Sequence, residues 1–209
     1  MSIEQKIRVL TVDDHPLLRS GIAAALQRAE DILLVGEATN GQEAIESFRI
    51  HRPDVTLMDL QMPVMNGIEA ILAIRLEFPT ARFAVLTTYH GDVQAVRALK
   101  AGATGYLLKS MLRDELIDTI RAIHAGRRRI PSEIAAEIAE HVVDDSLTDR
   151  EVEILRRVAA GASNKVIAWH LALSEATVKC HIRSILTKLS ANDRTHAVTI
   201  AMKRGFIDG

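Results

Sequence analysis

The sequence predicts an α/β domain with a parallel sheet, followed by a linker and a small all-helical domain. Through residues 1–125, short runs rich in β-branched residues alternate with stretches of helical periodicity, a pattern typical of βαβ units. Two runs, 55–58 and 83–86, are apolar on both faces, as expected for strands that are covered on both sides. After Gly126 the alternation stops. We therefore place domains at 1–125 and 147–209, joined by a linker at 126–146.

The first domain is expected to contain five strands and five helices. The strand-like runs are IRVLTV at 7–12, ILLVGEA at 32–38, DVTLMD at 54–59, RFAVLTT at 82–88 and TGYLLK at 104–109. Helical periodicity covers Leu17–Ala29, Gly41–His51, Gly67–Glu77, Asp92–Ala101 and Leu112–Ala125. Turn signals such as Asn66-Gly67 separate these units.

The remaining chain reads as a charged linker followed by helices. The linker carries Pro131 and allows one short amphipathic helix. From Leu147 the pattern is helical, with a break at Gly161. Ser163 and Ser174 stand where helix N-caps are expected.

Composition and charge exclude several classes of protein. The chain has 209 residues, 48% of them hydrophobic, and one cysteine, Cys180. One thiol makes no internal disulfide, no apolar run reaches about 18 residues, and no signal-peptide pattern is present. We therefore expect a cytoplasmic protein without membrane contact. Residues 1–126 carry 13 Lys/Arg against 16 Asp/Glu, whereas residues 146–209 carry 10 against 6. A basic tail suggests a polyanionic partner.

Polar side chains end four of the five predicted strands. Asp13 and Asp14 follow the first, Asp59 ends the third, Thr87 the fourth and Lys109 the fifth. Because carboxyl ends of parallel strands meet at one edge of a sheet, we expect these groups to form one site. Three carboxylates suit a hard cation such as Mg²⁺.

Asp59 has a second use at such an edge. A carboxylate beside Mg²⁺ can attack phosphorus and become an aspartyl phosphate. Mg²⁺ and Lys109 would neutralise the phosphoryl oxygens, and the Thr87 hydroxyl would hydrogen-bond one of them.

The motifs VDDH, LMDLQMPVMNG, VLTTYH and AGATGYLLK resemble the receiver domain of bacterial response regulators across residues 5–125. The resemblance implies a flavodoxin-like, doubly wound, five-stranded parallel sheet. It implies that Asp59 accepts a phosphoryl group from a sensor histidine kinase. Asp14 and Asp59 would bind Mg²⁺ directly, Asp13 would bind it through water, and the backbone carbonyl of Gln61 would be a further ligand.

The same resemblance assigns a conformational switch. Thr87 would be the switch hydroxyl, and Tyr106 the aromatic side chain that turns inward when Thr87 moves, with Lys109 as the third member of the set. From position alone, we hypothesise that the Gln61 and Tyr89 side chains tune the lifetime of the phosphate.

The third helix of the tail has two distinct faces. Helical spacing predicts a buried stripe of Val178, Ile182, Ile185 and Leu189. The opposite stripe is small and basic, with no acid on it, and consists of Ala176, Lys179, Cys180, Arg183 and Thr187. Such a face suits the DNA major groove. We add Thr177, Lys165 and Lys188 as further expected DNA contacts.

The stretch from LTDREVEILRRV to LTKLSANDR, residues 147–194, is similar to the LuxR-type helix-turn-helix. The whole chain thus resembles a two-component response regulator of the NarL/FixJ type. This implies a transcription regulator that binds double-stranded DNA half-sites and dimerises on phosphorylation. The last helix, about 193–203, would pair two subunits, with Ala197 and Ala201 permitting close approach.

Two other functions remain open. One is an Mg²⁺-dependent phosphatase, which would need an acid near Asp59, where the sequence has Gln61. The other is a DNA binder that works independently of phosphorylation. We expect no enzyme beyond self-catalysed aspartyl phosphorylation and dephosphorylation.

Overall fold

The computed structural model describes residues 6–88, 92–132, 135 and 147–207. They form two compact units, one built mainly on residues 6–88 and 95–132 and the other mainly on 147–207. Tyr89 and most of the predicted linker helix lie outside the described residues. No helix in the described ranges is long and apolar enough to cross a membrane.

The first unit contains a five-stranded parallel sheet in the order β2-β1-β3-β4-β5. Its strands are β1 (Ile7–Val12), β2 (Ile32–Ala38), β3 (Val55–Asp59), β4 (Phe83–Thr87) and β5 (Gly105–Leu108). Residues of β3 and β4 are buried throughout, as predicted for strands with helices on both faces. The sequence prediction of an α/β fold with a parallel sheet is confirmed.

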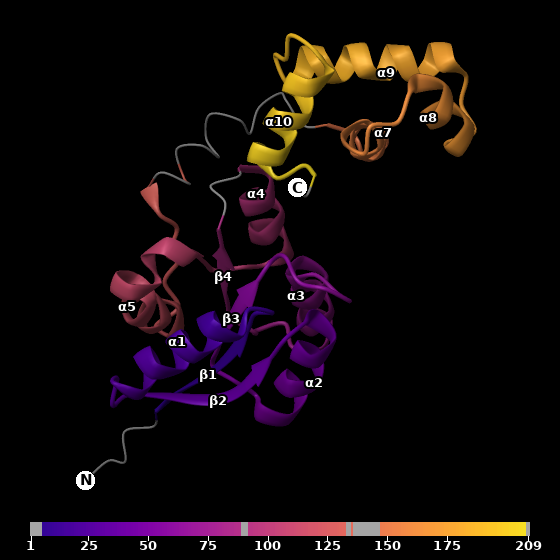
Figure 1. The fold of residues 1–209 in the computed structure, drawn as a ribbon. Coiled ribbons are helices and arrows are strands. Elements are labelled where there is room, and N and C mark those ends of the chain that lie inside the picture. The colour runs from indigo at the N-terminus through magenta and orange to yellow at the C-terminus, as the bar shows by residue number, and fades with distance from the viewer. Residues whose placement is uncertain (1–5, 89–91, 133–134, 136–146, 208–209) are drawn as a thin grey trace. The chain divides into compact units, whose positions relative to one another are not determined.

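Helices cover both faces of this sheet. They are α1 (Pro16–Gln27), α2 (Gly41–His51), α3 (Gly67–Glu77), α4 (Asp92–Ala101) and α5 (Leu112–His124), with a 3-10 turn η1 (Lys109–Met111) before α5. Figure 1 shows α1 and α5 on one face and α2 and α3 on the other. The predicted bounds agree with these to within two residues.

Local capping explains where α3 begins. The Asn66 side chain accepts a hydrogen bond from the Glu69 backbone N–H, and the Glu69 side chain accepts one from the Asn66 N–H. This capping box satisfies donors that the helix end leaves free. A Cβ on Gly67, the next residue, would lie 2.0 Å from the carbonyl oxygen of Asp59. Glycine therefore lets α3 start directly against the end of β3.

The segment after α5 adds to the open edge of β5. The Tyr106 N–H donates to the carbonyl of Arg129 at 2.8 Å, and the Arg129 N–H donates to the carbonyl of Thr104 at 3.1 Å. Arg129 also lies 3.6 Å from the carboxylate of Glu115. Contacts of the first unit thus continue past residue 125, where we placed its end, and that boundary stays a prediction.

The second unit consists of α7 (Asp149–Ala159), α8 (Asn164–His170), α9 (Glu175–Lys188) and α10 (Arg194–Arg204). Ser163 and Ser174 cap α8 and α9 as predicted, each accepting a backbone N–H three residues on. Thr148 and Glu151 form a capping box on α7. Asp193 caps α10.

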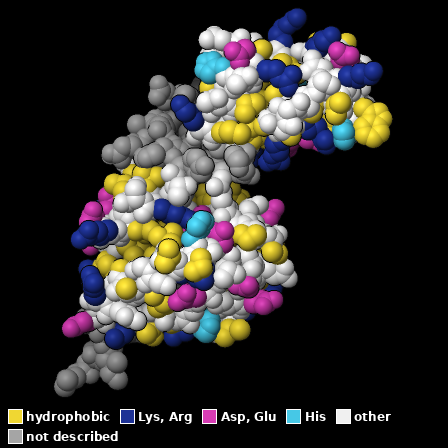
Figure 2. Space-filling view, viewed as in Figure 1, with side chains coloured by type: hydrophobic (Ala, Val, Ile, Leu, Met, Phe, Trp, Pro, Cys, Tyr) yellow, Lys and Arg dark blue, Asp and Glu magenta, His cyan; other side chains and the backbone are white. Residues whose placement is uncertain are grey.

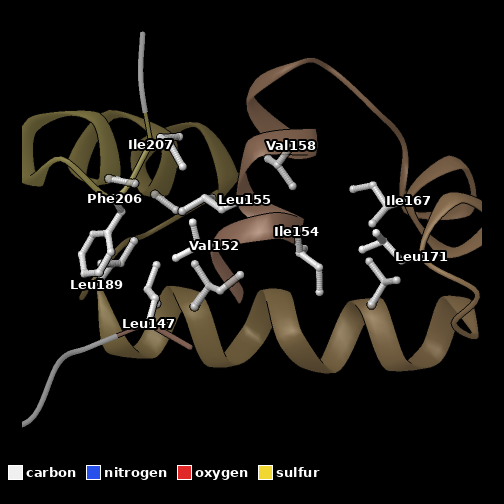
Figure 3. Close-up of a cluster of buried hydrophobic side chains, with 14 of the residues drawn as sticks. Leu147, Val152, Ile154, Leu155, Val158, Ile167, Leu171, Leu189, Phe206 and Ile207 are labelled. Atoms are coloured by element: carbon white, nitrogen blue, oxygen red, sulfur yellow. The ribbon is translucent and has the colours of Figure 1, made fainter. Parts of the chain in front are cut away.

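One hydrophobic core holds the four helices together. Figure 3 shows side chains from α7, from α8 and from the segments just before α7 and just after α10 converging on α9. The predicted buried stripe of α9 is confirmed, with Val178, Ile185 and Leu189 buried and Ile182 packed against them. Ala197 and Ala201, which we expected to face a second subunit, are 1% and 0% exposed in this core. That prediction is wrong, because the small side chains let α10 approach its own domain.

Candidate functional site

The predicted polar groups meet at one edge of the sheet. Asp13 follows β1, Asp59 ends β3, Thr87 ends β4 and Lys109 follows β5. The strand order makes β1, β3, β4 and β5 successive neighbours, all parallel. Their carboxyl ends therefore share one edge, which is where ligands bind in open α/β sheets.

Lys109 lies between two buried carboxylates. Its Nζ is 2.7 Å from Oδ2 of Asp59 and 2.8 Å from Oδ2 of Asp13. Asp13 is fully buried and Asp59 is 3% exposed. The Gln61 backbone N–H donates to the other Asp59 oxygen at 3.3 Å. One cation thus offsets the repulsion between two acids at the floor of the site.

Burial and charge act against each other on these groups. Burial raises the pKa of Asp59, and the negative charge of Asp13 raises it further, while Lys109 opposes both. Burial lowers the pKa of Lys109, but its bonds to Asp13 and Asp59 outweigh that effect and raise it. A second cation near Asp59 would favour the ionised carboxylate.

His15 is a member of the site that sequence reasoning missed. Its backbone N–H donates to Oδ1 of Asp13 at 2.8 Å, and its Nδ1 lies 2.8 Å from Oδ1 of Asp14. Arg19 donates to the Asp13 carbonyl at 2.7 Å. The His in VDDHP could have been noticed, since it directly follows the paired acids.

The donor set fits a hard divalent cation. Ligand atoms of Asp13, Asp14, His15 and Asp59 all lie within 4.8 Å of one another. Oδ2 of Asp13 and Oδ1 of Asp14 are buried, and each lies 2.8 Å from one nitrogen, the first from Nζ of Lys109 and the second from Nδ1 of His15. A carboxylate oxygen has more than one lone pair, so both oxygens keep capacity for a hard cation such as Mg²⁺. The arrangement is thus compatible with the predicted metal set, in which Asp13 and Asp59 are buried, Asp14 is half-buried and Gln61 is exposed.

The loop after Asp59 contains a strained turn. Val64 has φ +70°, and the N–H of Met65 donates to the carbonyl of Pro63 at 2.8 Å. A β-branched residue rarely adopts this conformation, and a three-residue turn of this hand is uncommon. The turn is held because the Met65 carbonyl accepts the N–H of Gly41. It leaves the Val64 side chain 81% exposed beside the site.

Two of the three predicted switch residues, Thr87 and Tyr106, lie inside the domain. Thr87 is 3% exposed and Tyr106 is 1% exposed. Both stand on neighbouring strands, with Thr87 opposite Leu108 and Val85 opposite Tyr106. The Tyr106 ring is therefore in the inward orientation here.

The expected DNA-facing side of α9 is exposed. Ala176, Lys179, Cys180, Arg183 and Thr187 all lie at the surface, and Cys180 is a free thiol. Lys165 on α8 is exposed as well. Figure 2 shows Lys and Arg side chains over α9. Thr177 is half-buried, and its hydroxyl lies 2.8 Å from that of the capping Ser174.

Two details of this face differ from expectation. Glu175 forms an ion pair with Lys179 at 3.2 Å, one helical turn on. The face therefore does carry an acid, and our statement that it had none is wrong. Lys188 donates to Glu151 at 2.7 Å. That partner argues against Lys188 as a DNA contact, a role that stays a prediction.

Glu151 is the centre of a buried polar network. Its Oε1 accepts a hydrogen bond from the Ser184 hydroxyl at 2.7 Å. Its Oε2 accepts one from the Lys188 ammonium at 2.7 Å and one from the Thr148 backbone N–H at 2.8 Å. Burial raises the pKa of Glu151, but these hydrogen bonds outweigh it and lower the pKa to about 2. The carboxylate, which is 3% exposed, is thus ionised and fully bonded. The pattern Thr148-x-x-Glu151 is a sequence signal for the Thr148 part of this network alone.

Models of two protein families match the two units. The response regulator receiver domain matches residues 9–121, more than half of the chain. The luxR family of bacterial regulatory proteins matches residues 145–201. The chain belongs to the response regulators. It combines a receiver domain with a LuxR-type DNA-binding domain and is a transcription regulator, as the resemblance predicted.

Relatives and solved structures agree with this assignment. The response regulator is 39% identical to the transcriptional regulatory protein LiaR of Bacillus subtilis, over 97% of this chain and all of that protein. It is 36% identical to the structure of ChrA, from a heme-sensing two-component system, with a TM-score of 0.58 over 97% and 99% of the chains. RcsB of Salmonella enterica serovar Typhimurium, bound to a promoter with BeF3⁻, gives 25% identity and a TM-score of 0.73 over 95% and 99%.

Proposed function

We propose that Asp59 accepts a phosphoryl group from a sensor histidine kinase and that this modification controls DNA binding. The observation that supports it most is the buried Asp59 carboxylate held 2.7 Å from the Lys109 ammonium. A carboxylate oxygen of Asp59 would form a bond to phosphorus while the bond from phosphorus to the histidine nitrogen breaks, and the electron pair would return to the imidazole. Lys109 would remain beside the new phosphoryl oxygens.

Mg²⁺ is the proposed cofactor. Asp13, Asp14 and Asp59 would hold it, with the Gln61 carbonyl as a further ligand, and it would neutralise negative charge on the transferred group. The Thr87 hydroxyl would hydrogen-bond a phosphoryl oxygen, and Tyr106 would respond to its movement. The reaction is self-catalysed transfer to the protein's own side chain. In dephosphorylation, water would attack the phosphorus, the bond to the Asp59 oxygen would break, and inorganic phosphate would leave.

Double-stranded DNA is the proposed target of the second domain. Lys179, Arg183, Cys180 and Thr187 on α9 would enter the major groove, and exposed Lys165 would contact phosphate. The RcsB complex with promoter DNA supports this use of the domain. We further propose a homodimer on phosphorylation and a place in the cytoplasm, where a kinase and DNA are both accessible.

Transfer from acetyl phosphate tests the first proposal. Intact mass should show one added phosphoryl group on the wild type in Mg²⁺, none on Asp59→Asn, and an unchanged gain on Asp118→Asn, whose side chain is 72% exposed. Uptake by Asp59→Asn at the wild-type rate would place the acceptor elsewhere.

DNA binding at a fixed salt concentration tests the coupling and separates the rival function. Phosphorylation should tighten binding by the wild type and leave Asp59→Asn unchanged. Equal affinity before and after full phosphorylation would instead identify a DNA binder that works independently of Asp59.

A further inference from the structure

A cavity lies at the end of the receiver domain opposite Asp59. It has a volume of about 270 Å³ and is bordered by the start of β3, the start of β4 and the ends of α2 and α3, two helices that lie side by side in Figure 1. Asp54 directly precedes β3, and Asp59 ends it. The cavity is therefore roughly 17 Å from the phosphorylation site along the strand.

The wall of this cavity is aromatic. The rings of Phe48 and Phe78 stack with centroids 5.1 Å apart. The guanidinium of Arg52 lies 3.9 Å from the centroid of the Phe78 ring. Pro53 and Ala81, which are buried, complete the apolar lining. Because Phe48 and Arg52 already stack on the Phe78 ring, an incoming flat ring would stack chiefly on the guanidinium of Arg52, whose plane suits aromatic rings.

Arg52 occupies a backbone position that suits glycine better. It is the C-cap of α2 and has φ +45° and ψ +61°, in the left-handed region. Glycine adopts this conformation without cost, whereas other residues pay for it. The left-handed C-cap directs the Arg52 side chain over the Phe78 ring, so this backbone conformation places a cation in the cavity wall.

The cavity also holds an uncommitted second cation. Among the described residues, the guanidinium of Arg82 has no hydrogen-bond or ion-pair partner. The Arg52 Nε donates to the Arg49 carbonyl at 3.0 Å, which leaves its two terminal nitrogens without an acceptor in the described ranges. Asp54, the acid of the lining, accepts the Arg8 backbone N–H at 2.8 Å. The Glu77 carboxylate, which pairs with Arg49, also attracts Arg52. The guanidinium of Arg82, unpaired within the described ranges, still leaves the cavity with an excess of positive charge, which favours an anion.

We propose that this cavity binds a small planar aromatic carboxylate, the ring lying against Arg52 and the phenylalanines and the carboxylate meeting Arg82. Carboxylates match the fork of a guanidinium. A cavity of 270 Å³ is slightly below the usual range for drug-sized ligands, so a ligand with a single ring fits its size. The site is independent of phosphorylation at Asp59.

Calorimetric titration of the full chain with benzoate tests the proposal, with benzamide as the uncharged isostere and inorganic phosphate as the anion without a ring. Benzoate should bind saturably, and benzamide and phosphate should bind at least about tenfold more weakly, because each lacks one of the two recognised features. Three variants assign the site. Arg82→Gln and Arg52→Gly should each weaken benzoate binding about tenfold, and Arg28→Gln, an exposed arginine outside the cavity, should not.

Arg52→Gly also separates the loss of a binding contact from the loss of folded protein. Because glycine suits the left-handed position, the melting temperature of this variant should stay within a few degrees of the wild type. Loss of benzoate binding in a folded Arg52→Gly protein supports the site. An absence of saturable binding up to about 10 mM benzoate, which corresponds to negligible affinity, overturns it. So would an equal loss in Arg28→Gln or equally tight binding of phosphate.

Discussion

The carboxylate of Glu151 and the ammonium of Lys188 form an ion pair at 2.7 Å that ties the first turn of α7 to the last turn of α9. Ser184, one turn earlier on α9, donates to the same carboxylate at 2.7 Å. Two positions of the proposed recognition helix are thus anchored to one buried acid. The orientation of α9, the proposed recognition helix, therefore depends on a residue of α7.

Replacement of Glu151 should destabilise the DNA-binding domain. The pKa of Glu151 is lowered from 4.5 to about 2, and a shift of that size corresponds to about 3 kcal/mol of stability at pH 7. Urea unfolding followed by the fluorescence anisotropy of Trp169, the single tryptophan of the chain, measures this domain. Glu151→Gln should lose about 3 kcal/mol. Glu153→Gln, in an exposed pair with Arg150, should lose less than about 1 kcal/mol.

The cost of Glu151→Gln should also depend on pH, with a definite sign. A carboxyl group whose folded pKa is depressed stabilises the protein above its unfolded pKa, and that stability disappears as the pH falls through the folded pKa. The difference in unfolding free energy between the wild type and Glu151→Gln should therefore be constant above pH 5 and decrease from pH 4.5 toward pH 2. A difference that stayed constant down to pH 2.5 would show that Glu151 acts through packing alone.

Asp59→Asn should stabilise the receiver domain when Mg²⁺ is absent. Burial and the neighbouring Asp13 raise the pKa of Asp59. The ionised carboxylate therefore lowers the stability of the folded protein at pH 7. This penalty disappears below the pKa of the unfolded chain, about 4, where the group is protonated in both states. We expect a gain of roughly 1 kcal/mol at pH 7, measured by thermal unfolding. Saturating Mg²⁺ should reduce this difference in stability between Asp59→Asn and the wild type, because the metal stabilises the wild type more than the variant. If Mg²⁺ left the difference in stability unchanged, Asp59 would not be a metal ligand.

Lys109→Met should slow phosphoryl transfer to Asp59 while retaining the fold. The ammonium is the one cation within 2.8 Å of both buried acids among the described residues, and loss of one preorganised charge at a reacting group typically costs about 10²-fold in rate. Mass spectrometry of acetyl phosphate reactions gives the rate. Lys100→Met, which removes an exposed lysine, should react like the wild type. If both variants were equally slow, net charge rather than Lys109 would explain the loss.

Periodicity and strand-end chemistry predicted most of the receiver domain from the sequence. Strand β3 is an apolar run that is buried throughout and ends in Asp59. A carboxylate at the end of such a run was therefore expected at the edge of the sheet, where the site lies. Contacts between segments far apart in the chain could not be predicted from the sequence in this way. The bond between Glu151 and Ser184 joins residues 33 positions apart, and no local pattern encodes it.

The errors have a physical origin as well. Small residues on a helix permit close approach to any surface, and the sequence does not say which. Ala197 and Ala201 face their own domain core rather than a second subunit. The place of His15 directly after the paired acids was a visible signal. That its ring nitrogen lies near both Asp13 and Asp14 depends on its rotamer, which the sequence does not specify.

DNA affinity should rise when Glu175 is neutralised. Glu175 holds Lys179 in an exposed ion pair at 3.2 Å, and its charge also repels DNA phosphates. Glu175→Gln should tighten binding about threefold and release Lys179 for DNA, whereas Arg183→Ala should weaken binding and lower the salt slope by about one. Fluorescence anisotropy of labelled promoter DNA at two salt concentrations measures both. Glu30→Gln, an exposed acid in the receiver domain, makes the same change in net charge. An equal gain in Glu30→Gln would mean that total charge, and not the α9 face, determines the affinity.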